Sequence, residues 1–146
     1  MNSIRCLLTV LSLLACGPWP RAAPVDGMAT LVQGLGDADP KVREQAAAQL
    51  GQPGPQAQAA VEPLMAALGH EDPYLRGAAA VALGRIGEAA VPALTRALGS
   101  DNVELRWSAA IALGRMGSAA GRAIPELVRL LSDPSVQVRQ VAAATL

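Results

Sequence analysis

Apolar residues recur along residues 26–146 in two alternating patterns, each with the spacing of an α-helix. The first pattern places apolar residues at i, i+3 and i+7, and the second places them at i, i+4 and i+8. Either spacing puts the apolar side chains on one face of a helix. The first pattern is formed by Met28/Leu31/Leu35, Val61/Leu64/Leu68, Val91/Leu94/Leu98 and Ile124/Leu127/Leu131, and the second by Val42/Ala46/Leu50, Leu75/Ala79/Leu83, Leu105/Ala109/Leu113 and Val138/Ala142/Leu146. The alternation predicts an all-α chain built from four pairs of helices.

The four helix pairs are copies of one repeating unit. An arginine follows an apolar residue and precedes an Ala-Ala pair in each copy, at Arg43, Arg76, Arg106 and Arg139. These arginines are 33, 30 and 33 residues apart, and the shorter middle period results from a shorter turn between two repeats. Self-similarity at this period is typical of an α-solenoid, in which each repeat packs only on its neighbours. We expect repeats at about residues 26–51, 56–84, 88–114 and 119–146.

Signals for the ends of the second helices recur at aligned positions. Asp39, Asp72, Asn102 and Ser135 are predicted N-caps, because their side-chain oxygens can accept a hydrogen bond from an unpaired N–H of the first turn. Pro40 and Pro73 follow at the first helical position, where proline is tolerated. Gly51, Gly84 and Gly114 are expected to end these helices in the left-handed conformation.

Composition and charge narrow the range of partners. Hydrophobic residues make up 51% of the chain but aromatic residues only 2%, so the core is built from Ala, Leu and Val. Lys+Arg and Asp+Glu both number 12, which gives no net charge and no basic stripe. Proteins that bind nucleic acids draw much of their affinity from such a stripe. The sequence therefore predicts no nucleic-acid partner.

The first residues form a targeting segment. Arg5 gives a positive start, and residues 6–16 are almost entirely apolar but too few to span a bilayer as a helix. The sequence Leu13-Leu14-Ala15-Cys16 resembles the lipobox of bacterial lipoproteins, in which cleavage precedes the cysteine and the cysteine is lipidated. We expect a signal peptide at 1–15, lipidation at Cys16 and a proline-containing tether at 16–25. Ordinary secretion and a retained anchor are the alternatives.

The cysteine count agrees with this interpretation, because Cys6 and Cys16 are the only cysteines of the chain. The repeat domain would therefore contain no disulfide. An exported location follows, at the cell envelope or in the periplasm, with membrane attachment through the N-terminal lipid if Cys16 is acylated.

The repeats resemble a known family. The segments DADPKVREQAAAQLG, HEDPYLRGAAAVALGRIG, SDNVELRWSAAIALGRMG and DPSVQVRQVAAATL are similar to the HEAT-like repeats first described in phycobilisome lyases. The resemblance implies a superhelix of four helix pairs that is right-handed, with the second helices lining its concave side. It implies that Arg43, Arg76, Arg106 and Arg139 form a structural ladder by bonding to acidic side chains and backbone at neighbouring turns, with ligand contacts as the alternative.

The same repeat occurs in scaffolds, binding subunits and a few enzymes. Di-iron hydroxylases of this architecture use several His-Glu pairs, whereas this chain has one histidine, His70, in a turn between helices. No serine has a histidine in register to serve as its base, and no mature cysteine other than Cys16 is present. We therefore predict no catalytic, cofactor-binding or metal-binding residues. The alternative is a subunit or fragment of a bilin-lyase-like or larger repeat enzyme.

A protein partner is expected on the second helices. Trp107 and Ile111 lie four residues apart on one helix face, Tyr74 and Val81 belong to the preceding repeat, and Gly77 would leave a hollow beside them. These four large residues are the predicted apolar patch for a partner, unless Trp107 lies over Gly77 and fills the space. Ala143 and Leu146 would be partly open, so a truncated array, a docked partner and self-association all remain open alternatives there.

Overall fold

The computed structural model describes residues 26–52, 54 and 57–146, and every regular element in these ranges is a helix. The predicted four helix pairs are confirmed. The signal peptide, Cys16 and the tether lie outside the described residues. The α-helices are α1 (Asp26–Gly34), α2 (Pro40–Leu50), α3 (Ala57–Leu68), α4 (Pro73–Ile86), α5 (Val91–Ala97), α6 (Val103–Met116), α7 (Ile124–Leu130) and α8 (Val136–Thr145), with 3-10 turns η1 (Gly87–Ala90) and η2 (Gly117–Ala123).

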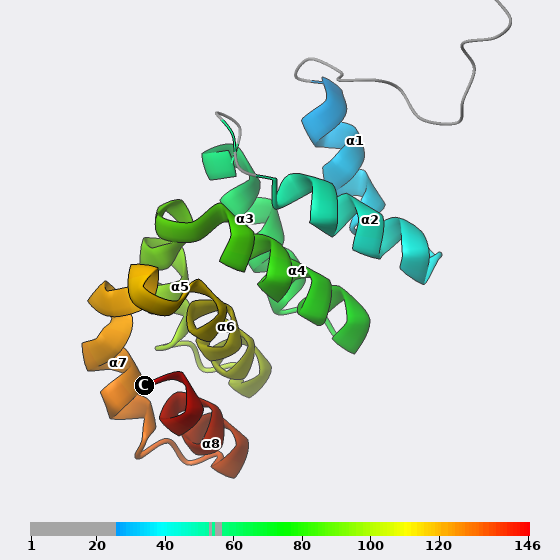
Figure 1. Cartoon of the computed structure of the whole chain (residues 1–146). Helices are drawn as coiled ribbons and strands as arrows, with labels where there is room; N and C mark the ends of the chain where they lie inside the picture. Colours follow the sequence, from blue (N-terminus) through cyan, green and yellow to red (C-terminus); the bar gives the residue numbers. More distant parts are fainter. Residues whose placement is uncertain (1–25, 53, 55–56) are drawn as a thin grey trace, which may run out of the picture.

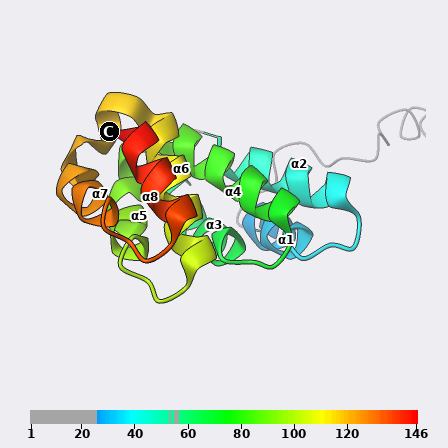
Figure 2. The same cartoon turned by 90° about the horizontal axis from the view of Figure 1, so that it is seen from below.

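The helices form two layers (Figures 1 and 2). Helices α1, α3, α5 and α7 make one layer, and α2, α4, α6 and α8 make the other. Each second helix packs on the first helix of its own repeat, and α2, α4 and α6 also pack on the second helix of the next repeat. The first and last repeats therefore lie at opposite ends of the array (Figure 1), as expected for an α-solenoid.

Most residues of the predicted apolar stripes form the core, whereas Ile124, Leu131 and Leu146 of the fourth repeat are exposed. Leu64, Leu94 and Leu127 of the first helices are fully buried, and so are Leu83 and Leu113 of the second helices. Burial of each such leucine stabilises the fold by about 1.5–3 kcal/mol. The alanines between them are buried as well, and their small side chains let neighbouring helices approach closely.

The predicted ends of two second helices are wrong. Helices α4 and α6 continue through Gly84 and Gly114 to Ile86 and Met116. The residues with positive φ are Gly87 (73°) and Gly117 (56°), one turn later. Gly51 does end α2, but with φ of −78° and therefore outside the left-handed region.

Close packing explains the glycines at these aligned positions. A Cβ added at Gly51 would lie 2.5 Å from the Cα atom of Ala82 on the next second helix. A Cβ at Gly84 would lie 3.1 Å from the Cβ of Arg115, and one at Gly114 would lie 3.1 Å from the Oγ1 of Thr145. Gly51, Gly84 and Gly114, which we call the glycine column, therefore set how closely consecutive second helices approach one another.

Asp39, Asp72 and Asn102 accept a hydrogen bond from the backbone N–H two residues later, at 2.9 Å in each case. Ser135 does not cap α8 through its side chain. Its hydroxyl instead faces the side chain of Gln137, with 3.5 Å between Oγ and Oε1, which is too long for a strong bond. Ser135 therefore occupies the predicted N-cap position of α8, but the predicted side-chain hydrogen bond is absent.

Residues Pro73–Ala97 are long and apolar enough, by composition, to cross a membrane as one helix. In the structure this stretch is divided into α4, η1 and α5, and the positive φ of Gly87 separates the first two. Its apolar residues, such as Leu83 and Leu94, are buried in the solenoid core.

Candidate functional site

The four aligned arginines hold the turns that precede their own helices. From Nη1, each donates hydrogen bonds to two consecutive backbone carbonyl oxygens of that turn. The acceptors are Asp37 (2.7 Å) and Ala38 (3.1 Å) for Arg43, His70 and Glu71 (both 2.9 Å) for Arg76, Ser100 (2.8 Å) and Asp101 (3.1 Å) for Arg106, and Asp133 (2.6 Å) and Pro134 (3.0 Å) for Arg139. Each arginine thereby provides a hydrogen-bond donor to two carbonyl groups of the turn, which lie outside the hydrogen bonding of the helices.

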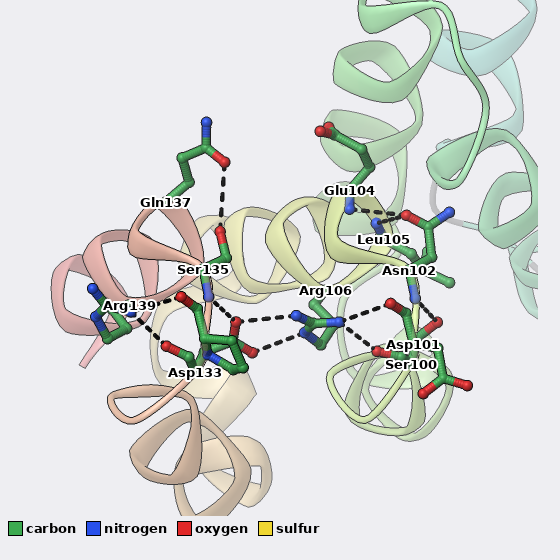
Figure 3. Close-up of polar contacts among 11 residues, drawn as sticks. Ser100, Asp101, Asn102, Glu104, Leu105, Arg106, Asp133, Ser135, Gln137 and Arg139 are labelled. Carbon is green, nitrogen blue, oxygen red and sulfur yellow. Dashed lines mark hydrogen bonds and ion pairs between the residues drawn. The ribbon is translucent and has the colours of Figure 1, made fainter.

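Three of these arginines also reach a carboxylate in the next repeat. Arg43 pairs with Asp72, and Arg76 pairs with Glu104 at 3.0 Å. Arg106 donates from Nε and Nη2 to the two oxygens of Asp133, at 2.8 and 3.0 Å (Figure 3). The carboxylates come from different sequence positions: Asp72 and Asp133 lie in the turns before α4 and α8, and Glu104 lies in the first turn of α6. This is the arrangement expected of a structural ladder.

The pair between Arg106 and Asp133 is buried, since the Asp133 side chain is only 5% exposed. The hydrogen bonds from Arg106 hold the pKa of Asp133 below its usual range, although burial acts to raise it, and the N–H of Ser135 and the charge of Arg139 add to the lowering. The same bond with Asp133 raises the pKa of Arg106. A buried carboxylate stays charged in this way only while its cationic partner is present, so the ion pair between Arg106 and Asp133 links the third repeat to the fourth.

Two of the predicted partner-binding residues line a hollow on the face of the second helices. Tyr74 is 77% exposed and Val81 is half-buried. Both border a space of about 370 Å³, which we call the Gly77 hollow, lined also by Glu44, Ala48, Pro73, Gly77, Ala78, Arg85 and Arg115. Apart from the chain next to Gly77 and the backbone of its own helix, no described atom lies within 4 Å of the position that a Cβ on Gly77 would take. Trp107 therefore does not cover Gly77.

Trp107 and Ile111 occupy a different environment. Both are half-buried and pack against the hydrophobic core, and neither borders the Gly77 hollow. The structure therefore divides the predicted patch, with Tyr74 and Val81 at the hollow and the other two residues at the core.

Sequence reasoning missed Arg85 and Arg115 as site residues. Both are exposed, border the Gly77 hollow, and make no ion pair within the part of the chain that the structure describes. They occupy aligned positions one residue after Gly84 and Gly114. Helix ends at those two glycines would place both arginines in the turns that follow. They lie instead on the last turns of α4 and α6, at one edge of the hollow.

A second space, of about 300 Å³, is bordered by Glu88, Val91, Pro92, Thr95, Ala119 and Arg122. The hydroxyl of Thr95 donates to the carbonyl oxygen of Val91 at 2.8 Å and is therefore already occupied. Among residues 26–52, 54 and 57–146, no group of three or more His, Cys, Asp and Glu side chains could hold a metal ion. The Gly77 hollow is the better candidate for a binding site, because it combines an exposed aromatic ring with three charged side chains, Glu44, Arg85 and Arg115, none of which makes an ion pair among the described residues.

The profile of one protein family, described as HEAT repeats, matches residues 28–104 and again residues 88–146. No curated protein matches the chain. Similar solved structures include an engineered protein of the Northeast Structural Genomics Consortium, 27% identical, with 84% of this chain and 61% of that chain covered and a TM-score of 0.49. A designed armadillo repeat protein in complex with the peptide (KR)4 is 21% identical, with 81% and 62% covered and a TM-score of 0.47.

The complex of CpcE and CpcF of phycocyanin lyase from Nostoc sp. PCC7120 is also similar. It is 24% identical, with 90% of this chain and 68% of that chain covered and a TM-score of 0.43. The chain spans less than two thirds of the length of the engineered protein and of the designed armadillo repeat protein.

Proposed function

The chain belongs to the family of HEAT repeats, and we propose that it is a non-catalytic module that binds a protein partner on the concave face formed by its second helices. The Gly77 hollow carries this proposal. It is an open space lined by residues of the second helices α2, α4 and α6, which pack closely on one another at Gly51 and Gly84.

The lining of the Gly77 hollow indicates what the partner presents. Ala48, Val81 and the ring of Tyr74 offer an apolar floor, and an exposed tyrosine of this kind often contributes strongly to binding. Arg85 and Arg115 also line the hollow, together with Glu44, and a guanidinium group can donate two parallel hydrogen bonds to one carboxylate. We infer that the partner inserts an apolar side chain next to an acidic residue.

The proposal includes an exported location at the cell envelope, with attachment through lipid on Cys16. The lipobox-like sequence supports it. Metabolic labelling with a radioactive fatty acid should mark the wild-type chain and not a Cys16→Ser variant. Equal labelling of both, or of neither, would contradict the anchor and leave the binding site to be tested separately.

The substitution Gly77→Leu tests the binding site directly. Because Gly77 is exposed and a Cβ there meets no atom within 4 Å, the leucine fills the hollow without displacing the fold. We expect the variant to keep the wild-type melting temperature or exceed it, since glycine inside a helix is unfavourable. We expect it to lose a partner that the wild-type chain captures from crosslinked envelopes.

Gln140→Leu is the matched control, because Gln140 is exposed at the aligned position of α8, away from the hollow. A double variant, Arg85→Glu with Arg115→Glu, should lose the same partner through charge repulsion. Full capture by Gly77→Leu would contradict the proposed site. A pigment or metal bound to the purified chain would contradict a non-catalytic role and favour the alternative, a subunit or fragment of a bilin-lyase-like or larger repeat enzyme.

A further inference from the structure

The Gly77 hollow lies lengthwise between second helices that run in the same direction. The first ion pair of the arginine ladder joins the beginning of α2 to the turn before α4. Toward the other ends of these two helices, a Cβ on Gly51 would contact Ala82. Seven residues earlier along both helices, Glu44 is therefore level with the beginning of α4 and lies at the same end of the hollow as Tyr74. Both side chains are exposed, and Glu44 has no ion-pair partner among the described residues.

The opposite end of the hollow carries two positive charges. A Cβ on Gly84 would lie 3.1 Å from the Cβ of Arg115 on α6, so Arg85, the next residue of α4, begins beside Arg115. Both arginines border the hollow, and neither pairs with a carboxylate in the described part of the chain. The hollow therefore has an acid and an aromatic ring at one end, two guanidinium groups at the other, and the apolar floor between them.

The dimensions of the hollow favour an extended peptide. Tyr74 and Arg85 are 11 residues apart on α4, and at about 1.5 Å per residue they lie about 16 Å apart along the helix. A volume of about 370 Å³ spread over that length leaves a channel about 5 Å wide, close to the spacing of about 4.8 Å between neighbouring strands. A helix with its side chains is about 10–12 Å across and would not enter it. About five residues of extended chain, at about 3.3 Å each, span the hollow from end to end.

We propose that the Gly77 hollow binds an extended segment of the partner protein that carries a basic and an acidic side chain about five residues apart, with small apolar side chains between them. The inference rests on the proposed function and adds the basic residue and the extended form of the segment. The basic side chain lies between Glu44 and the ring of Tyr74, since a carboxylate and the face of an aromatic ring both attract a cation. The acidic side chain meets Arg85 and Arg115, and the apolar side chains cover the floor.

The two ends of the hollow select against segments that carry a single sign of charge. An acidic segment would place one carboxylate next to Glu44, and a basic segment would place one cation next to Arg85 and Arg115. Like charges brought together at an interface oppose binding. A segment with both charges is the class that forms a favourable pair at each end.

A nuclear magnetic resonance titration of the full chain with capped hexapeptides tests the inference, and the backbone N–H of Gly77 reports on occupation of the hollow. The mixed peptide is acetyl-Lys-Ala-Val-Ala-Val-Glu-amide, and two further peptides carry lysine at both ends or glutamate at both ends. We expect the mixed peptide to shift the Gly77 signal at millimolar concentration. Each single-sign peptide should bind at least about threefold more weakly, the size expected for loss of an exposed ion pair.

Glu44→Lys should reverse this order, because the peptide with two glutamates then forms a favourable pair at both ends. Glu88→Lys is the matched control, since Glu88 is exposed, undergoes the same change of charge and does not border the hollow. It should keep the wild-type order. Tyr74→Leu should weaken binding of the mixed peptide about twofold through loss of the ring and leave the peptide with two glutamates unaffected.

A wild-type chain that binds either single-sign peptide as well as the mixed peptide overturns the inference. So does a Gly77 signal that the mixed peptide leaves unchanged at millimolar concentration, or a Glu44→Lys variant that keeps the wild-type order. The proposed function is judged separately, because it depends on whether Gly77→Leu loses the partner captured from envelopes.

Discussion

Gly51 and Gly77 provide a direct test of how the second helices pack. Replacement of either by alanine adds one methyl group, but the surroundings differ. At Gly51 the new Cβ would lie 2.5 Å from the Cα of Ala82 and 2.9 Å from its carbonyl oxygen, both backbone atoms of α4. At Gly77 it would meet nothing within 4 Å.

The distances set the expected size of each effect. Carbon atoms pack at about 3.5–4.0 Å, so α4 would have to move about 1 Å from α2 to accept Gly51→Ala. Overpacking of this kind costs about 1–3 kcal/mol. Backbone strain does not contribute, because the φ of −78° at Gly51 is open to alanine. Gly77→Ala should instead raise the free energy of unfolding by about 1 kcal/mol, since Gly77 lies inside a helix.

Urea unfolding followed by circular dichroism measures both changes. The two variants should move in opposite directions from the wild type, with unchanged m-values, and differ from each other by about 2–4 kcal/mol. Because repeats contribute separately to a solenoid, Gly51→Ala should weaken mainly the boundary between the first and second repeats. A Gly51→Ala variant as stable as the wild type would refute the close-packing explanation of the glycine column.

Three further predictions concern the turns and the core. Because the pKa of Asp133 is lowered in the folded state, its charged form stabilises the fold above about pH 4, and this stabilisation is lost as the pH falls through the lowered pKa. Urea titrations across this pH range should show that the free energy of unfolding depends less on pH in Asp133→Asn than in the wild type. The same pH dependence in both proteins would contradict this. Asn102→Ala should lower stability by about 1 kcal/mol and Ser135→Ala by much less, because the side chain of Asn102 makes a capping hydrogen bond and that of Ser135 does not. Equal shifts in melting temperature for the two variants would contradict this. Ser108→Ala should raise stability by about 1 kcal/mol, because the buried Ser108 hydroxyl has no hydrogen-bond partner in the described structure, and a lower melting temperature would contradict this.

The repeat register could be predicted from the sequence because each repeat is local and periodic. Residues such as Leu64 and Leu83 follow helical spacing within a few turns, and the structure buries both. The helix ends were harder to predict, because one sequence does not distinguish a glycine that ends a helix from a glycine that allows a neighbouring helix to pack closely. Gly84 and Gly87 are three residues apart, and only the structure shows that the second has positive φ.

The candidate site could be predicted only in part, for a related reason. The sequence aligns the positions of successive repeats, but the direction in which a side chain points also depends on how the repeats are stacked. Trp107 and Gly77 share an aligned position, yet Trp107 packs on the core while the space beside Gly77 is open. The carboxylates of the ladder show the same limit, because Asp72, Glu104 and Asp133 reach equivalent arginines from three different sequence positions.

The arginines of the second helices fall into two groups, those paired within the chain and those without an ion-pair partner at the Gly77 hollow. At the turns before the second helices, Arg43, Arg76 and Arg106 are bound by carbonyl and carboxylate groups of the chain itself. At the other ends of those helices, Arg85 and Arg115 have no ion-pair partner in the described residues, and with Glu44 they give the lining of the hollow a net charge of +1. The last turn of a helix carries partial negative charge that offsets part of their field. If the proposed partner binds at the hollow, we therefore expect these two arginines to act through direct hydrogen bonds to a carboxylate more than through attraction over long distances.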